Sequence, residues 1–169
     1  DGYRINGGIG FSIKDPQIDC LFGIDSVFSI NDQRSAVFTV EETNRLIKRL
    51  ESIKEQYAFE NCISCSIYGN ALPPYGFGSN SALYFSCVEA VFLVNGAEYD
   101  SDIITRASGR GGTSGIGVNT YFNGGFVLDI GIKNANDSLR PSSQGEREAY
   151  PLVLHKCNAP EWKLGICIP

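Results

Sequence analysis

The chain has 169 residues, a length typical of one domain that buries a substantial hydrophobic core. Hydrophobic residues make up 43% of it and charged residues 20%, which is typical of a globular protein and not of a disordered one. The net charge of −5 argues against general nucleic-acid binding, and no charge-free apolar run reaches the roughly 18 residues of a membrane span. We therefore expect no nucleic-acid partner and no membrane partner.

Strands and one amphipathic helix are predicted in the first part of the chain. "GGIGFSI" (7–13) indicates a strand entered through glycines, and "IDCLFGIDSVFSI" (18–30) indicates one or two more. A Thr-x-x-Glu capping box at Thr39 precedes apolar residues at helical spacing, so residues 40–58 should form a helix with a charged outer face. "CISCSIYG" (62–69) indicates a strand whose Ile63, Cys65 and Ile67 share one face.

A second helix, apolar nearly all round, is predicted from Ser81 to Val94, and such a helix is buried. Asn95-Gly96 should end it. Two short helices follow in "DSDIITRAS", capped by Asp100 or Ser101, and in "SGIGVNTYF". "FVLDIG", "YPLVLH" and "WKLGICI" indicate further strands, and "NANDSLRPSSQGERE" a polar loop. Helices that do not strictly alternate with strands favour the α+β class.

Six cysteines raise the question of a metal site. Cys62-x-x-Cys65 has ligand-like spacing, but Cys157 and Cys167 do not form a second pair of that kind. On a strand, Cys62 and Cys65 would also point to opposite faces. We therefore expect buried, reduced thiols and no metal site, which favours a reducing cytoplasm.

A glycine turn stands directly before the buried helix, in "PPYGFGSNSA" (73–82). A helix start presents unpaired amide N–H groups and a partial positive charge, and glycines let a phosphate approach the backbone closely. The stretch is neither a Walker loop nor a dinucleotide fingerprint, so it is either a phosphate site or a purely structural turn. The residues that would contact phosphate are Gly76, Gly78, Ser79, Asn80 and Ser81, the last three as side-chain donors or as the helix cap.

A denser glycine cluster, residues 108–117, opens into the later short helix. Arg106 and Arg110 flank it, and arginine offers a fork that matches phosphate or carboxylate oxygens. Because so many glycines are hard to justify by packing alone, we expect a second anchor here; the alternative is that the arginines are solvated or pair with acidic neighbours. Its expected residues are Arg110, Gly112, Thr113 and Ser114, with Thr113 or Ser114 able to cap the helix.

Both clusters resemble those of a known family. "PPYGFGSNSA" resembles the Pro-x-x-Gly-Leu-Gly-Ser-Ser-Ala phosphate loop of the GHMP kinases. "SGRGGTSGIGVNTYFNGGFVLDIG" (108–131) and "RINGGIGFSI" (4–13) resemble more closely one branch, the β-ribofuranosylaminobenzene 5′-phosphate synthases, and "EWKLGICIP" at the end is similar too. The resemblance covers most of residues 4–131.

The resemblance implies an α+β fold of the GHMP kinase N-terminal type, a two-layer domain also described as ribosomal protein S5 domain 2-like. Residues 1–169 would form a single domain of this type. We expect the chain to be a fragment that lacks the first strand and the C-terminal domain.

The resemblance also implies a reaction. The synthase joins phosphoribosyl pyrophosphate to a 4-substituted benzoate, forming a carbon–glycosyl bond and releasing carbon dioxide and pyrophosphate, on the way to a methanopterin-type cofactor. Mg²⁺ would bridge the pyrophosphate. No catalytic acid or base can be assigned. Carried over by motif, the first phosphate anchor is Gly76, Gly78, Ser79 and Ser81, and the second phosphate or carboxylate anchor is Arg110, Thr113 and Ser114.

Two alternatives stay open: an ATP-dependent small-molecule kinase of the same fold, and a non-catalytic relative that only binds a phosphorylated ligand. Such kinases commonly carry an Asp where this chain has Gly117, and glycine cannot orient or deprotonate a hydroxyl. The synthases usually show Asp-Gly-Gly-His where this chain has residues 129–132, Asp-Ile-Gly-Ile. His155, the one histidine, is expected at the surface of a strand. The expected partner is a small phosphorylated substrate, the expected compartment the cytoplasm, and a homodimer is one option.

Overall fold

The structure is a computed structural model that describes residues 3–34, 38–69, 77–133, 151–163 and 165. Its helices are α1 (Val40–Tyr57), α2 (Ser79–Val94), α3 (Ser101–Ser108) and α4 (Ile116–Asn123). Its strands are β1 (Arg4–Ile5), β2 (Gly8–Phe11), β3 (Ile18–Asp25), β4 (Ser29–Asp32), β5 (Cys62–Gly69), β6 (Phe126–Asp129), β7 (Ile132–Lys133) and β8 (Val153–Cys157). The expected α+β class is confirmed.

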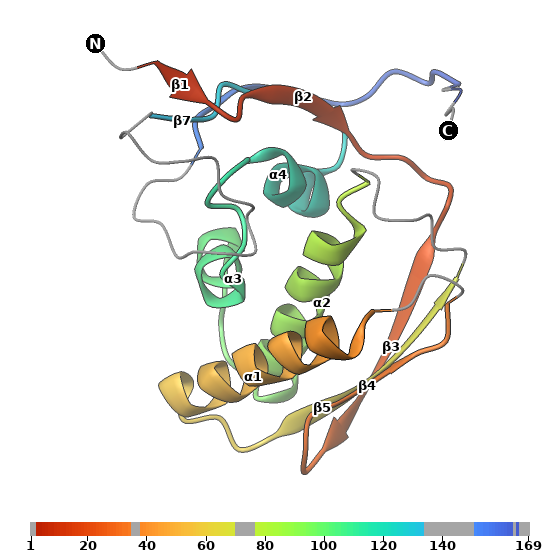
Figure 1. The fold of residues 1–169 in the computed structure, drawn as a ribbon, viewed down its shortest axis with the longest axis vertical. Helices are drawn as coiled ribbons and strands as arrows, with labels where there is room; N and C mark the ends of the chain where they lie inside the picture. The colour runs from red at the N-terminus through yellow and green to blue at the C-terminus, as the bar shows by residue number, and fades with distance from the viewer. Residues whose placement is uncertain (1–2, 35–37, 70–76, 134–150, 164, 166–169) are drawn as a thin grey trace.

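Two three-stranded sheets flank the helices (Figure 1). In one sheet, β6 lies between β2 and β8, and all pairs are antiparallel. In the other, β5 lies between β3, which runs antiparallel to it, and β4, which runs parallel. Helix α4 packs on the first sheet, whereas α1 and α2 pack on the second (Figure 1). The helices therefore lie between the two sheets, and the main hydrophobic core joins them to the β3-β5-β4 sheet.

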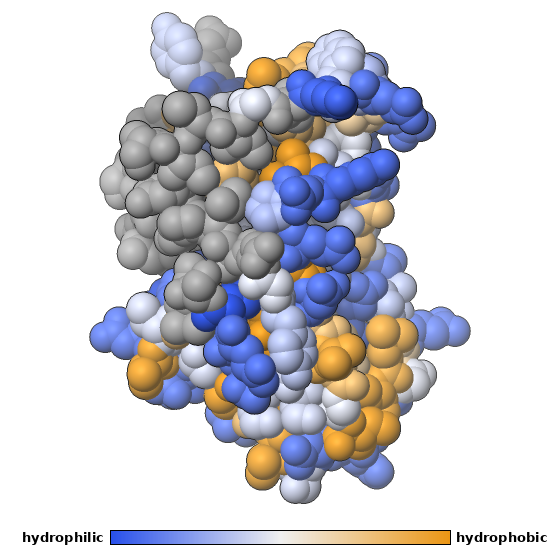
Figure 2. All heavy atoms as spheres, turned by 90° about the vertical axis from the view of Figure 1, so that its right-hand side faces the viewer, coloured by the Kyte–Doolittle hydropathy of each residue, from blue (hydrophilic) through white to orange (hydrophobic). Residues whose placement is uncertain are grey.

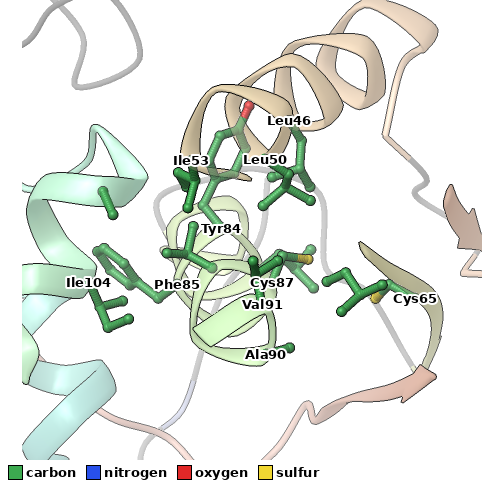
Figure 3. Packing of buried hydrophobic residues seen from close by; sticks show 14 of the residues in the cluster. Leu46, Leu50, Ile53, Cys65, Tyr84, Phe85, Cys87, Ala90, Val91 and Ile104 are labelled. Atoms are coloured by element: carbon green, nitrogen blue, oxygen red, sulfur yellow. The ribbon is translucent and has the colours of Figure 1, made fainter. Parts of the chain in front are cut away.

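Helix α2 forms the centre of this core, as its uniformly apolar sequence predicts. Phe85, Cys87 and Val88 have no exposed surface. In Figure 3, Cys87 lies between α1 and β5, whereas Phe85 points toward Ile104 of α3. Ile63, Cys65 and Ile67 of β5 are at most 1% exposed, which confirms the face predicted for this strand. Burying a side chain of this size stabilises the fold by about 1.5–3 kcal/mol relative to leaving it exposed.

Helix α1 begins as its sequence predicts. The Thr39 hydroxyl accepts from the Glu42 amide, and the Glu42 carboxylate accepts from the Thr39 amide, so the capping box is complete. Its apolar stripe, Leu46, Leu50 and Ile53, is buried against α2.

The predicted starts of two helices need correction. Helix α2 begins at Ser79, two residues before the predicted Ser81, and its cap is Gly78 rather than a serine or Asn80. Gly78 adopts the left-handed conformation (φ +68°), which glycine reaches without steric cost. The cap of α4 is Gly115, not Thr113 or Ser114.

The ends of the elements otherwise follow the predictions. Asp100 caps α3, Asn95 ends α2, and His155 is exposed on β8. The strand predicted in "WKLGICI" is absent at Trp162, Lys163 and Gly165, while the rest of that stretch and the polar loop at 134–148 lie outside the described residues. Across the described part of the chain, none of the helices combines the length and the apolarity that crossing a membrane requires.

Candidate phosphate-binding site at two helix starts

The start of α2 is open. Among the described residues no side chain caps this helix, and its first turn carries no acidic residue. A side chain built on Gly78 would meet no atom of the described residues within 4 Å. Within the described part of the chain, the first-turn amides of Ser79, Asn80 and Ser81 have no capping side chain, and together with the helix dipole they favour an anion. Gly76 lies outside the described residues.

The side chain of Asn80 is held away from this opening by α1. Its amide nitrogen donates to Oε1 of Glu42 at 3.2 Å, while Oε2 of the same carboxylate closes the capping box of α1. One glutamate thus ties the starts of α1 and α2 together. Asn80 is positioned to contribute its backbone amide to a ligand, whereas its side chain is already committed.

The start of α4 lies against the start of α2. A Cβ built on Gly117 would stand 3.7 Å from Cβ of Ser81, an ordinary van der Waals distance. Further along, the Tyr121 hydroxyl donates to Glu89 of α2 at 2.7 Å and lies 3.1 Å from the Ser86 hydroxyl. Burial and the bond to Glu89 raise the pKa of Tyr121 well above its usual value. The two glycine clusters, about 35 residues apart in sequence, therefore meet in space.

A buried carboxylate that the sequence analysis did not include in the site lies at the start of α4. Asp129, at the end of β6, is 1% exposed. Its Oδ2 accepts from the Gly115 amide at 2.7 Å and from the Ser114 hydroxyl at 3.1 Å, and its Oδ1 accepts from the Gly131 amide at 2.7 Å. The protein thus places its own anion at this helix start. The local signal for it was an acidic residue at the end of a buried strand.

The two hydroxyl side chains expected at this anchor, Ser114 and Thr113, both already have partners within the protein. The Ser114 hydroxyl donates to Asp129 and accepts from the Ile116 amide at 3.3 Å, so it already has partners within the protein. Thr113 also has a partner within the protein, and Gly112 is buried. Of the two helix starts, that of α2 is the more open to an added anion.

Arg110 lies against α2 rather than in solvent. Its guanidinium carbon stands 3.9 Å from the centre of the Tyr84 ring, a cation–π contact of about 0.5–2 kcal/mol. Tyr84 is one helical turn after Asn80 on the same face of α2, and it points toward α1 in Figure 3. Stacking occupies the flat face of the guanidinium and directs its N–H groups away from the ring. Arg110 is thus pre-positioned about one turn from the open start of α2.

Packing explains more of the glycines than the sequence analysis allowed. A Cβ on Gly111 would come within 2.6 Å of Val118 and 2.9 Å of Thr105, and one on Gly115 within 3.1 Å of Val153. At Gly111 a side chain would clash with the protein itself, and at Gly115 it would be tightly packed, so packing accounts for these two glycines without a ligand. Gly78 is different, because none of the residues that the structure describes lies within 4 Å of a side chain built there.

The cysteines form no metal site among the described residues, where no group of three metal-ligating side chains occurs. Cys62, Cys65 and Cys87 are buried and unpaired, as expected, but Cys157 is exposed, and Cys167 lies outside the described residues. Hydrogen bonding to Cys65, followed by burial, raises the pKa of Cys20. The Cys20 thiol is therefore protonated at neutral pH.

Comparison of structures identifies the class of fold. The chain resembles L. major mevalonate kinase, solved in complex with R-mevalonate, with a TM-score of 0.51 and 16% sequence identity. The match covers 76% of this chain and 47% of the kinase chain. Mevalonate kinase is a GHMP kinase, so the fold expected from the glycine clusters is confirmed. No family model matches the sequence.

Comparison of sequences identifies the nearer relatives. The chain is 26% identical over 183 residues to the beta-ribofuranosylphenol 5′-phosphate synthase of Methanothermobacter thermautotrophicus and 26% identical over 170 residues to that of Archaeoglobus fulgidus. The synthase of Methanocaldococcus jannaschii is 24% identical over 187 residues. The resemblance to this synthase family is confirmed. Each match covers 98% of this chain but only 50–53% of the relative, so the chain spans about half the length of these synthases.

Proposed function

We propose that this chain forms the phosphate-binding half of a β-ribofuranosylaminobenzene or β-ribofuranosylphenol 5′-phosphate synthase-like enzyme. Such an enzyme joins phosphoribosyl pyrophosphate to a 4-substituted benzoate. The bond from the ribosyl carbon to pyrophosphate breaks, a bond to the ring carbon forms, and the carboxylate leaves as carbon dioxide. The names of the relatives favour a hydroxyl as the 4-substituent. The observation that carries the proposal is the open, glycine-capped start of α2.

The α2 start would hold the phosphate groups of the substrate. The amides of residues 79–81 converge there, and hydrogen bonds from such groups to an anion contribute about 1.5–3 kcal/mol each. Charge that develops on departing pyrophosphate would be stabilised by donors fixed before the reaction begins. Arg110, held on the Tyr84 ring, would add a second positive centre nearby.

The start of α4 would act differently. Because Asp129 already occupies it, a second phosphate there would face a carboxylate at hydrogen-bond distance from the same amide. We infer that Asp129 fixes Ser114 and the α4 start in place and that the substrate phosphate lies on the α2 side. No residue is assigned as an acid or base, because this transfer needs no proton from the protein when the benzoate reacts as its anion.

Mg²⁺ belongs to this proposal as a companion of the pyrophosphate. The ion is commonly held by substrate phosphates with one or two carboxylates, not by a cage of protein groups. Of the described residues none is assigned to it, since the Asp129 oxygens already accept three hydrogen bonds. Bound with the substrate, the ion would neutralise charge on the leaving pyrophosphate.

An ATP-dependent kinase is the second candidate, favoured by the likeness to mevalonate kinase. The residue at position 117 argues against a kinase. Gly117 lies beside Ser81 between the two helix starts, and it offers no carboxylate to a substrate hydroxyl. The neighbouring acid, Asp129, is committed to backbone amides and Ser114.

One assay on the full-length protein distinguishes the synthase, the kinase and the non-catalytic relative. The protein is incubated with Mg²⁺ and either phosphoribosyl pyrophosphate plus 4-hydroxybenzoate or 4-aminobenzoate, or ATP plus mevalonate as a test alcohol. The proposal predicts pyrophosphate release that depends on the benzoate. Release of ADP would support the kinase. Saturable binding of phosphoribosyl pyrophosphate without turnover would support the non-catalytic relative and overturn the synthase proposal.

A further inference from the structure

Strand β3 is an exposed sheet edge of unusual character. In the order β3-β5-β4 it has β5 as its one neighbour among the described residues, so the backbone groups of its other side face away from the sheet. It is eight residues long and pairs with β5 without a register shift, and strands of about five or six residues are typical. Long regular edges invite pairing with a further strand.

The devices that normally protect such an edge are missing from β3. It contains no lysine, no proline and no bulge, and its charged residues are the two aspartates Asp19 and Asp25 near its ends. Apolar side chains are exposed between them: Leu21 is 64% and Ile24 67% exposed. Figure 2 shows apolar surface gathered on the lower part of the molecule, at the height of this sheet in Figure 1.

The two faces of β3 differ. Cys20, Phe22 and Ile24 lie on the side of Ile67, Cys65 and Ile63, toward the helices. The opposite face carries Asp19, Leu21, Gly23 and Asp25. An added strand must therefore supply apolar groups on one side and tolerate acidic groups on the other.

A second copy of β3 has both of these properties. When two identical edge strands pair antiparallel, two residues opposite each other must both be odd-numbered or both be even-numbered. The reason is that both must point their backbone N–H and C=O groups toward the partner strand, or both away from it. With Leu21 on the two-fold axis, Ile18 faces Ile24 of the second copy and Cys20 faces Phe22. The same register places Asp19 opposite Gly23 and Asp25 opposite Gln17, so no two acids face each other.

The two neighbouring registers of this strand pair are less favourable. Moving the axis to Phe22 places Asp19 opposite Asp25 in both halves of the pair. Moving it to Cys20 places Asp15 opposite Asp25 and leaves Ile24 facing Pro16, which has no amide hydrogen. Like charges directly opposite each other destabilise a strand pair. Charge therefore selects the Leu21-centred register.

We propose that β3 is a dimerisation strand: two copies of this chain pair antiparallel through β3 about a two-fold axis at Leu21, joining their β3-β5-β4 sheets into one six-stranded sheet. The helices of both copies lie on the same side of that sheet. This inference is independent of the proposed function, because it uses none of the residues at the two helix starts. The interface is isologous, as most homodimer interfaces are.

The experiment compares the mass in solution of the full-length protein and two variants, at equal concentration. Leu21→Lys places two ammonium groups together at the axis, and we expect it to convert the dimer to a monomer. Leu154→Lys is the matched control, since Leu154 is 63% exposed on β8, an edge of the other sheet, and we expect this variant to remain a dimer. A monomeric parent, a dimeric Leu21→Lys variant, or dissociation in both variants overturns the proposal.

A cross-link tests the register. At the axis the two Cα atoms of residue 21 would lie about 4.5–5.5 Å apart, within the span of a disulfide. Oxidised Leu21→Cys should give a covalent dimer whose linked peptide joins residue 21 to itself, while Leu154→Cys should not. A covalent link from residue 21 to another cysteine, or none at all, contradicts the Leu21-centred register.

Discussion

Replacing Gly10 by alanine probes the contact that positions α4. A Cβ at Gly10 would lie 2.2 Å from Cγ2 of Ile116, the first residue of α4. Cγ2 is attached directly to the β-carbon, and isoleucine in a helix has essentially one rotamer, so the clash must be relieved by moving backbone. Overpacking of this kind costs about 1–3 kcal/mol, which we expect Gly10→Ala to lose from the free energy of unfolding.

The effect of Gly10→Ala on the free energy of unfolding should change sign once Ile116 is truncated. In an Ile116→Ala background the clashing methyl is gone, and alanine in a strand is favoured over glycine by about 0.5–1 kcal/mol. Gly10→Ala should then stabilise, which gives a coupling of about 1.5–4 kcal/mol in a double-mutant cycle measured by urea unfolding. Gly8→Ala is the control on the same strand, because its Cβ would lie 3.4 Å from the flexible end of Ile116. A coupling below about 0.5 kcal/mol would refute the reasoning.

Three further experiments test the buried polar contacts. Asp32 forms an ion pair with Arg34 at 2.5 Å. Burial raises the pKa of Asp32, but the hydrogen bonds from the Arg34 side chain and the Phe38 amide outweigh burial, so the pKa is lowered below its ordinary value of 3.8. Its stabilising effect is therefore complete above about pH 4 and disappears as the pH falls through the lowered value, so Asp32→Asn should cost about 3–5 kcal/mol at pH 7 and progressively less in acid, measured by unfolding across pH. Asn95→Ala removes the side chain that bonds the backbone of residues 60, 61 and 91, and we expect thermal unfolding to show a loss of about 1–3 kcal/mol. Asp129→Asn should destabilise more than Ser114→Ala in urea, because one carboxylate accepts three bonds there; equal effects would contradict that assignment.

Local patterns in the sequence predicted most elements correctly. The capping box at Thr39 gave the start of α1, and the apolar run gave α2 as the core helix, because both signals arise within one or two helical turns. The start of α2 was misplaced by two residues because glycine in the left-handed conformation, not a serine side chain, ends the preceding turn.

What the sequence could not predict depends on contacts between distant segments. Asp129 reaches the α4 start from 14 residues further along the chain, so no local motif marks it as the partner of Gly115. Likewise, the sequence could not show that Val118 and Thr105 pack against Gly111, which is why the glycines of this cluster looked hard to justify by packing. The resemblance to the synthases predicted the fold, but not which helix start already holds a carboxylate.

The most direct test of the phosphate site compares two glycines of one helix. Gly78 before α2 and Gly96 after it are both left-handed, with φ of +68° and +64°, and both have open space where a side chain would stand. Valine at either position should cost similar stability, but only Gly78→Val covers the first-turn amides. By titration calorimetry on the full-length protein with Mg²⁺, we expect Gly78→Val to weaken binding of phosphoribosyl pyrophosphate about tenfold or more and Gly96→Val to leave it unchanged. Equal affinity in both variants would contradict the account.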